Sequence, residues 1–156
     1  MKKVLFISST GGHLSELLQL EPLFEEYNYS IITEKTKSTL GLLKKYPKRV
    51  FYLVSGTKSH IISYVFKFSY NVLKSLYLFL KINPDVIVTT GTHTAVPMCY
   101  WGKLFKRKII FIETFANSDT KTQAGSMIYP IADTFIVQWE AMLELYPNAT
   151  YGGWIY

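Results

Sequence analysis

The chain has 156 residues, of which 49% are hydrophobic and 16% aromatic, a length that fits one domain and a composition that excludes an intrinsically disordered protein. Its net charge is +6, and its single cysteine, Cys99, excludes an internal disulfide and a cysteine-rich metal site and indicates a reducing compartment. The apolar run Val4-Leu5-Phe6-Ile7 is too short for the core of a signal peptide or for a membrane span, so it predicts a buried strand.

Strands and helices are predicted to alternate along the whole chain. The predicted strands cover residues 3–8, 29–33, 50–54, 85–89, 108–112, 133–137 and 149–151. The predicted helices cover residues 13–26, 38–45, 59–82, 94–105, 122–131 and 139–145. Because such alternation forms right-handed βαβ units, the sequence predicts the α/β class, with residues 1–156 forming a single doubly wound, mainly parallel Rossmann-like sheet.

The first strand runs into Ser-Ser-Thr-Gly-Gly-His-Leu-Ser-Glu, residues 8–16, which opens a helix. Gly11 and Gly12 allow close approach to the backbone, the helix N-terminus favours phosphate or carboxylate, and His13 can transfer a proton. The same residues also suit an ordinary strand-to-helix connector. Because the dinucleotide fingerprint Gly-x-Gly-x-x-Gly is absent and Glu34 alone matches the acid expected after it, NAD binding is a remote option.

The middle of the chain is strongly basic. Between residues 35 and 108 lie fourteen lysines and arginines and one acid, Asp85. This charge implies an anionic partner, and because no nucleic-acid motif accompanies it, an anionic membrane surface is predicted and no nucleic acid.

The predicted helix over 59–82 carries Lys67, Lys74 and Lys81, which are spaced by seven and form one stripe. Near this stripe lie four polar or aromatic residues: His60, Ser63, Tyr70 and Asn71. The wide apolar face is centred on Ile62, Val65, Phe66, Leu73, Leu76, Phe79 and Leu80. Two interpretations stay open, a helix buried on the sheet with its lysines in water, and the preferred interfacial helix whose lysines meet anionic headgroups. A membrane span is disfavoured because Lys74 would lie near its centre.

Polar loops follow two more strands. Thr90, Gly91, Thr92 and His93 follow the strand at 85–89, while Glu113 and Asn117 follow the strand at 108–112. Because parallel strands end at the same edge of a sheet, we expect these loops and His13 to form one ligand site. Taken singly, each loop is also explained by turn chemistry, with Thr92 capping a helix and Glu113 or Asn117 closing a loop.

The chain resembles a family of glycosyltransferase subunits. The resemblance rests on residues 8–16, on Pro-Asp-Val-Ile-Val-Thr-Thr-Gly at 84–91, on Phe-Ile-Glu-Thr-Phe-Ala at 111–116, on Tyr-Pro-Ile-Ala-Asp-Thr-Phe-Ile-Val-Gln-Trp at 129–139, and on Tyr146-Pro147 and Gly152-Gly153. These motifs are similar to those of the anchor subunit of the dolichol-linked UDP-N-acetylglucosamine transferase and of bacterial capsule glycosyltransferase enhancers. A more distant similarity is to the N-terminal half of the peptidoglycan lipid-intermediate N-acetylglucosaminyltransferase.

The resemblance implies a GT-B glycosyltransferase split into two chains, in which this chain is the acceptor-side domain and a separate subunit binds the UDP-sugar. The acceptor is then a lipid-diphosphate-linked saccharide, Gly11 and Gly12 face its diphosphate or the cleft, His13 is the catalytic base and Glu16 orients it. No cofactor and no metal are expected. The eukaryotic subunit has an N-terminal membrane anchor that this sequence lacks, so we expect peripheral attachment to the cytoplasmic face of the membrane through the helix at 59–82.

Two other functions stay open. The first alternative is a non-catalytic module that recruits a complete transferase to the membrane, in which case His13 is structural. The second alternative is a small enzyme that works alone. One domain of 156 residues lacks the second Rossmann unit of a GT-B enzyme, so we expect it to be inactive alone. The apolar residues Trp154, Ile155 and Tyr156 are expected to be buried by the partner.

Overall fold

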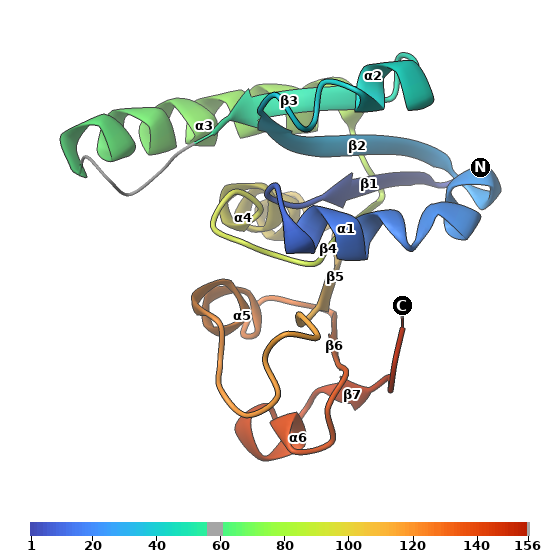
Figure 1. Cartoon of the computed structure of the whole chain (residues 1–156), viewed down its shortest axis with the longest axis vertical. Coiled ribbons are helices and arrows are strands. Elements are labelled where there is room, and N and C mark those ends of the chain that lie inside the picture. Colours follow the sequence, from blue (N-terminus) through green and yellow to red (C-terminus); the bar gives the residue numbers. More distant parts are fainter. Residues whose placement is uncertain (56–60, 156) are drawn as a thin grey trace.

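The computed structural model describes residues 1–55 and 61–155, with the backbone alone over 61–65. This part of the chain forms one seven-stranded parallel sheet in the order β3-β2-β1-β4-β5-β6-β7, which confirms the predicted α/β class (Figure 1). Its strands are β1 (Lys3–Ile7), β2 (Asn28–Lys35), β3 (Val50–Val54), β4 (Val86–Thr89), β5 (Lys108–Ile112), β6 (Thr134–Val137) and β7 (Thr150–Tyr151). The strand order reverses between β1 and β4, and this reversal is where ligands collect in doubly wound sheets.

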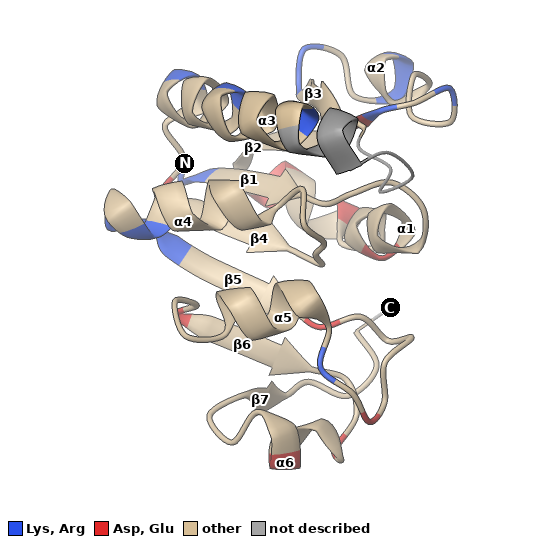
Figure 2. Cartoon of the chain, turned by 90° about the vertical axis from the view of Figure 1, so that its left-hand side faces the viewer, with Lys and Arg blue, Asp and Glu red and all other residues tan. Residues whose placement is uncertain are grey.

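Helices cover both faces of the sheet. Buried side chains of α3 (Ile61–Ile82), α4 (Val96–Leu104), α5 (Gln123–Ile128) and α6 (Met142–Leu145) form one core cluster with the sheet. A second cluster joins the opposite face to α1 (Gly12–Leu18), the 3₁₀ helix η1 (Glu21–Glu26) and α2 (Leu42–Lys45). Figure 2 shows α3, α4 and α5 side by side in front of the strands.

The predicted helix over 13–26 is wrong in one respect, because the structure divides it into α1 and η1. Helix α1 ends at Leu18, and Pro22 lies in the first turn of η1, where a residue without an N–H fits best. The helices predicted over 38–45 and 139–145 shorten to single turns, α2 and α6. The remaining elements match within a few residues.

Helix α3 has a buried and an exposed apolar side, so it packs on the sheet with only part of its apolar surface, and contact of the exposed part with a membrane stays a prediction. Asn71, expected beside the lysine stripe, is instead buried and hydrogen bonds to both backbone groups of Val54 in β3. Phe79, expected on the exposed apolar face, is also buried. Phe66 and Leu73 remain 73% and 68% exposed. His60 and the side chains of Ile62, Ser63 and Val65 lie outside the described residues.

The lysine stripe borders this exposed side. The Nζ of Lys74 lies 5.6 Å from the ring centre of Tyr70, and the Nζ of Lys81 lies 6.0 Å from that of Tyr77. Among the described residues, no helix combines the length and apolar character needed to cross a membrane.

Cys99 lies in the middle of α4 and is fully buried against the sheet. Burial raises the pKa of its thiol to about 12, because the apolar surroundings disfavour the thiolate. It therefore serves as a small apolar residue of the core.

Candidate functional site

The loops after β1 and β4 meet at the reversal point of the sheet and enclose a pocket of about 270 Å³ with the start of α5. The sequence-predicted residues His13, Thr90, Gly91, Thr92 and His93 all line this pocket. The sequence analysis missed the contribution of α5, which adds three residues: Thr122, Gln123 and Ala124. Thr122 is the N-cap of α5, and a cap signature before an amphipathic run was available to find it.

His13 is held in one orientation by the loop after β4. Its Nδ1 lies 2.8 Å from the carbonyl oxygen of Thr90, and the Thr90 hydroxyl donates back to the carbonyl of His13 at 2.7 Å. Because a carbonyl oxygen only accepts, this contact places a proton on Nδ1, and in the neutral ring Nε2 is then left as a base. Gly91 has a φ of 96°, which favours glycine, and a Cβ there would be in ordinary van der Waals contact with the His13 ring, 3.6 Å from Nδ1.

Glu16 has a different partner from the one that the family resemblance implies. Its Oε1 accepts hydrogen bonds from the hydroxyl of Thr114 at 2.8 Å and from the backbone N–H of Phe115 at 3.1 Å. Its Oε2 lies 3.9 Å from Nδ1 of His13, which is beyond hydrogen-bonding distance. The carbonyl of Thr90, and not Glu16, therefore orients His13.

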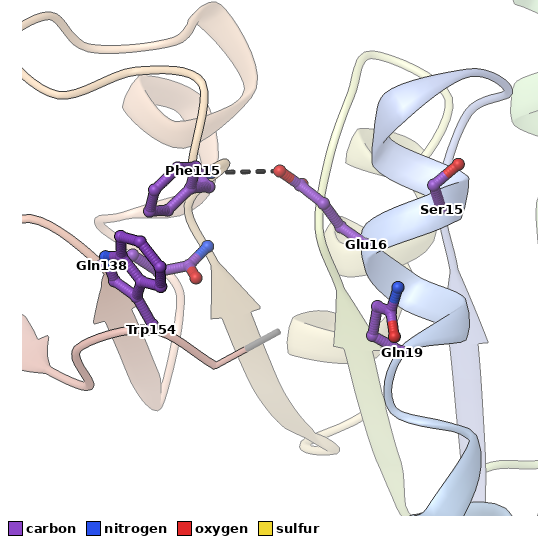
Figure 3. A pocket seen from close by; sticks show the side chains of 6 residues that line it. All are labelled: Ser15, Glu16, Gln19, Phe115, Gln138 and Trp154. Carbon is purple, nitrogen blue, oxygen red and sulfur yellow. Dashed lines mark hydrogen bonds between the residues drawn. The ribbon is translucent and has the colours of Figure 1, made fainter.

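Glu16 points instead into a second pocket, of about 320 Å³, between α1, the loop after β5 and the segment after β7 (Figure 3). Its lining residues are Ser15, Glu16, Gln19, Phe115, Gln138 and Trp154. This pocket was not predictable from the sequence, because its residues come from α1 and from the segments after β5, β6 and β7, which only the fold brings together.

Glu113 is buried and does not line either pocket. Its carboxylate accepts hydrogen bonds from the hydroxyls of Thr122 and Tyr146 and from the N–H of Thr114. Burial raises the pKa of Glu113 above its ordinary value, although these hydrogen bonds oppose the shift. The expected substrate contact of Glu113 is therefore corrected to a structural one, in which it ties the end of β5 to α5 and α6.

Asn117 also lies outside both pockets. Its side chain is half-buried and donates to the carbonyl of Thr120 at 3.2 Å, which is the loop-closing contact that the sequence left open as an alternative.

The glycine turn has the backbone that the sequence predicts but a weaker helix behind it. Gly11 has a φ of 79°, which favours glycine, and no atom lies within 4 Å of where a Cβ of Gly11 or Gly12 would stand. Helix α1 has only seven residues, so its dipole contributes little to anion binding.

Glu34 offers no carboxylate oxygen to a nucleotide ribose. It is buried at the end of β2, where hydroxyls of Thr10, Ser55 and Thr94 donate to it. This arrangement removes the feature that kept NAD binding open as an option. The described residues contain no group of three or more metal-ligating side chains.

Comparisons with solved structures agree on the fold. MurG of Acinetobacter baumannii is similar with a TM-score of 0.72 and 16% identity, over 90% of this chain and 43% of that one. MnaA of S. aureus, solved with UDP, has a TM-score of 0.72 and 17% identity over 97% of this chain and 43% of that one. These similarities establish the Rossmann-like fold of the N-terminal domain of GT-B enzymes.

Sequence comparisons identify the family. The protein of Mus musculus named UDP-N-acetylglucosamine transferase subunit ALG14 is 26% identical over 97% of this chain and 82% of its own length. The protein of Candida albicans with that name is 30% identical over 92% of this chain and 74% of its own length. The model of the family described as "Oligosaccharide biosynthesis protein Alg14 like" matches residues 4–155. The chain therefore belongs to the Alg14-like family of oligosaccharide biosynthesis proteins.

Proposed function

We propose that this chain is the acceptor-side subunit of a membrane-associated glycosyltransferase, and that it acts only with a separate subunit that binds the donor. The relatives named as subunits of a UDP-N-acetylglucosamine transferase support such an assembly. The fold comparison also supports it, because the chain has the fold of the N-terminal domain of GT-B enzymes such as MurG. In the proposed reaction, a sugar moves from a UDP-sugar to a hydroxyl group of a lipid-diphosphate-linked saccharide.

The observation that carries the catalytic part of the proposal is the hydrogen bond between His13 Nδ1 and the carbonyl of Thr90. With its proton on Nδ1, neutral His13 has Nε2 available to take the proton of the acceptor hydroxyl. As that proton leaves, the hydroxyl oxygen bonds to the anomeric carbon, the bond from this carbon to the UDP oxygen breaks, and the configuration inverts.

The acceptor diphosphate is proposed to lie in the pocket beside His13. Thr92 and His93 line this pocket, and the exposed Gly11 and Gly12 precede His13 in the chain with open space around them. Small polar groups and accessible backbone are suited to phosphate oxygens.

The exposed side of α3 is proposed to attach the chain to the cytoplasmic face of a membrane. Leu104 and Phe105 at the end of α4 extend this apolar surface, since the ring centre of Phe105 lies 5.1 Å from that of Phe79 in α3. Figure 2 shows lysine and arginine residues along α3 and where α4 leads into β5. Apolar side chains bordered by cations are the surface that an anionic bilayer binds.

A non-catalytic recruitment module is the second candidate, because α3 alone would suffice for that role. The deciding assay measures sugar transfer from a UDP-sugar to a lipid-diphosphate acceptor, first with each subunit alone and then with both. We expect transfer only with both subunits. Full activity of this chain alone would contradict the split enzyme, and full activity of the partner alone would favour the recruitment module.

A further inference from the structure

The second pocket has no role in the proposed chemistry of His13, yet it is bounded by aromatic and hydrogen-bonding side chains. Figure 3 shows Glu16 and Gln19 extending from α1 toward Phe115, Gln138 and Trp154 on the opposite wall. Its volume of about 320 Å³ is at the lower end of the range of small-molecule sites.

Glu16 is anchored in this pocket through only one of its two carboxylate oxygens. Both hydrogen bonds from the loop after β5 go to Oε1, while Oε2 is buried and has no hydrogen-bond partner among the residues that the structure describes. Because a buried carboxylate oxygen without a donor costs free energy, a ligand hydroxyl that donates to Oε2 would remove this cost. The anchoring through Oε1 also means that the acceptor atom is already positioned.

The opposite wall presents aromatic rings in a fixed arrangement. Phe115 packs against Trp139 with ring centres 4.7 Å apart, and Trp139 donates through Nε1 to the carbonyl of Phe115. Trp154 meets Phe115 edge to face, with ring centres 5.2 Å apart, and remains 74% exposed. A rigid indole with an open face beside hydrogen-bonding groups suits a ligand that is apolar on one side and polar at its edge.

We propose that this pocket binds one pyranose ring of the glycosyltransferase substrates. The identification of the ligand as a sugar rests on the proposed function. The C–H face of the ring packs on Trp154 and Phe115, and a ring hydroxyl donates to Oε2 of Glu16. Gln19 and Ser15 lie along the same wall of α1. Because Oε2 of Glu16 lies 3.9 Å from Nδ1 of His13, the sugar subsite adjoins the catalytic pocket.

The test compares Trp154→Ala, Trp154→Phe and Glu16→Gln in the complex with the donor-binding subunit. Tyr151→Ala is the matched control, since Tyr151 is an exposed aromatic residue that lines neither pocket. We expect Trp154→Ala to raise one KM by about fivefold to tenfold, the scale of losing one aromatic contact. The sugar subsite replaces the expectation from the sequence that the partner buries Trp154, so affinity for the partner subunit should stay unchanged. Trp154→Phe should restore most of this loss, and Glu16→Gln should raise the same KM. The substrate whose KM rises identifies the ring as belonging to the donor or to the acceptor.

A second measurement separates this proposal from the proposed function. Saturation-transfer NMR with N-acetylglucosamine and the full chain reads sugar binding without any transfer reaction. Signal with the wild type that is lost in Trp154→Ala supports the sugar subsite even where the complex transfers no sugar. Absence of signal together with unchanged KM values would overturn it. Loss of partner affinity with unchanged KM values would overturn it as well, and would make Trp154 a contact with the partner subunit.

Discussion

Two regions of the molecule, the crevice at the carboxyl ends of the strands and the outer side of α3, differ in how far the chain itself buries and hydrogen bonds their side chains. In the crevice, short polar side chains such as Thr90 and Glu113 are buried and already hydrogen bonded within the chain. On the outer side of α3, Phe66, Leu73 and Leu80 are more than half exposed. The crevice is therefore held in place by hydrogen bonds within the chain, whereas the outer side of α3 leaves large apolar side chains uncovered, which is typical of an interaction surface.

If the crevice performs the chemistry, His13→Ala should have the largest effect. We expect sugar transfer by the complex to fall by about 100-fold or more, the usual loss when a general base is removed. Circular dichroism and partner binding should remain as in the wild type. Asn117→Ala is the control within the same crevice edge and should leave transfer unchanged. Wild-type turnover by folded His13→Ala would assign the chemistry to the partner.

If the outer side of α3 contacts lipid, reversing the charge of its three lysines should weaken membrane binding without affecting the crevice. Lys67, Lys74 and Lys81 changed together to Glu should weaken binding to anionic vesicles by more than about tenfold, since each lysine contributes about 1 kcal/mol near such a surface. Vesicle flotation at low and high salt measures this, and salt should weaken the wild type.

The matched control makes the same change of charge away from α3, by converting the exposed residues Lys35, Lys37 and Lys48 to Glu. This variant should lose much less binding. An equal loss in both variants would mean that net charge, and not the α3 surface, determines attachment.

The attachment of α3 to the sheet depends on Asn71, which connects the two regions. Asn71→Ala removes both part-buried hydrogen bonds to the backbone of Val54, so the free energy of unfolding should fall by about 1–3 kcal/mol. Urea denaturation followed by circular dichroism measures it. The exposed Asn148 provides the control, and Asn148→Ala should change the stability by less than about 0.5 kcal/mol. Equal stabilities of the two variants would contradict the contact.

The smallest expected effect is a pH dependence from Glu113. Because burial raises its pKa in the folded state, the folded chain binds this proton more tightly than the unfolded chain does. The resulting stabilisation is complete below the unfolded pKa near 4.5 and is lost as the pH rises through the raised folded pKa. Because Glu113→Gln has no carboxyl group to ionise, its free energy of unfolding relative to that of the wild type should increase as the pH rises from the unfolded pKa through the folded pKa. Urea midpoints measured from pH 4 to pH 8 test the sign, and a relative decrease would contradict it.

The sequence predicted the parts of the fold that local pattern determines. Apolar β-branched runs such as Val86-Ile87-Val88 gave the strands, and their order in the chain placed His13 and Thr90 at one edge. Pro22 is a residue that often marks the start of a new helix, so it could have indicated the break between α1 and η1. A single helix was predicted because the amphipathic pattern continues through Pro22.

The contacts that define the site were beyond the sequence because each joins residues far apart. His13 and Thr90 are 77 positions apart, and Glu16 and Phe115 are 99 apart. The residues around Glu113 in the sequence do not reveal whether its carboxylate faces a ligand or a distant tyrosine. Only the packing of Tyr146 against the end of β5 distinguishes the two.

The burial of Cys99 makes the chain well suited to single-site spectroscopic labelling. The only thiol in the sequence is inaccessible and resists ionisation, so maleimide or nitroxide reagents should leave the wild type unmodified. A cysteine introduced at Leu73 or Trp154 would then carry the single label. Its accessibility to lipid-soluble or water-soluble quenchers would report directly on the depth of α3 in a bilayer and on the occupancy of the second pocket.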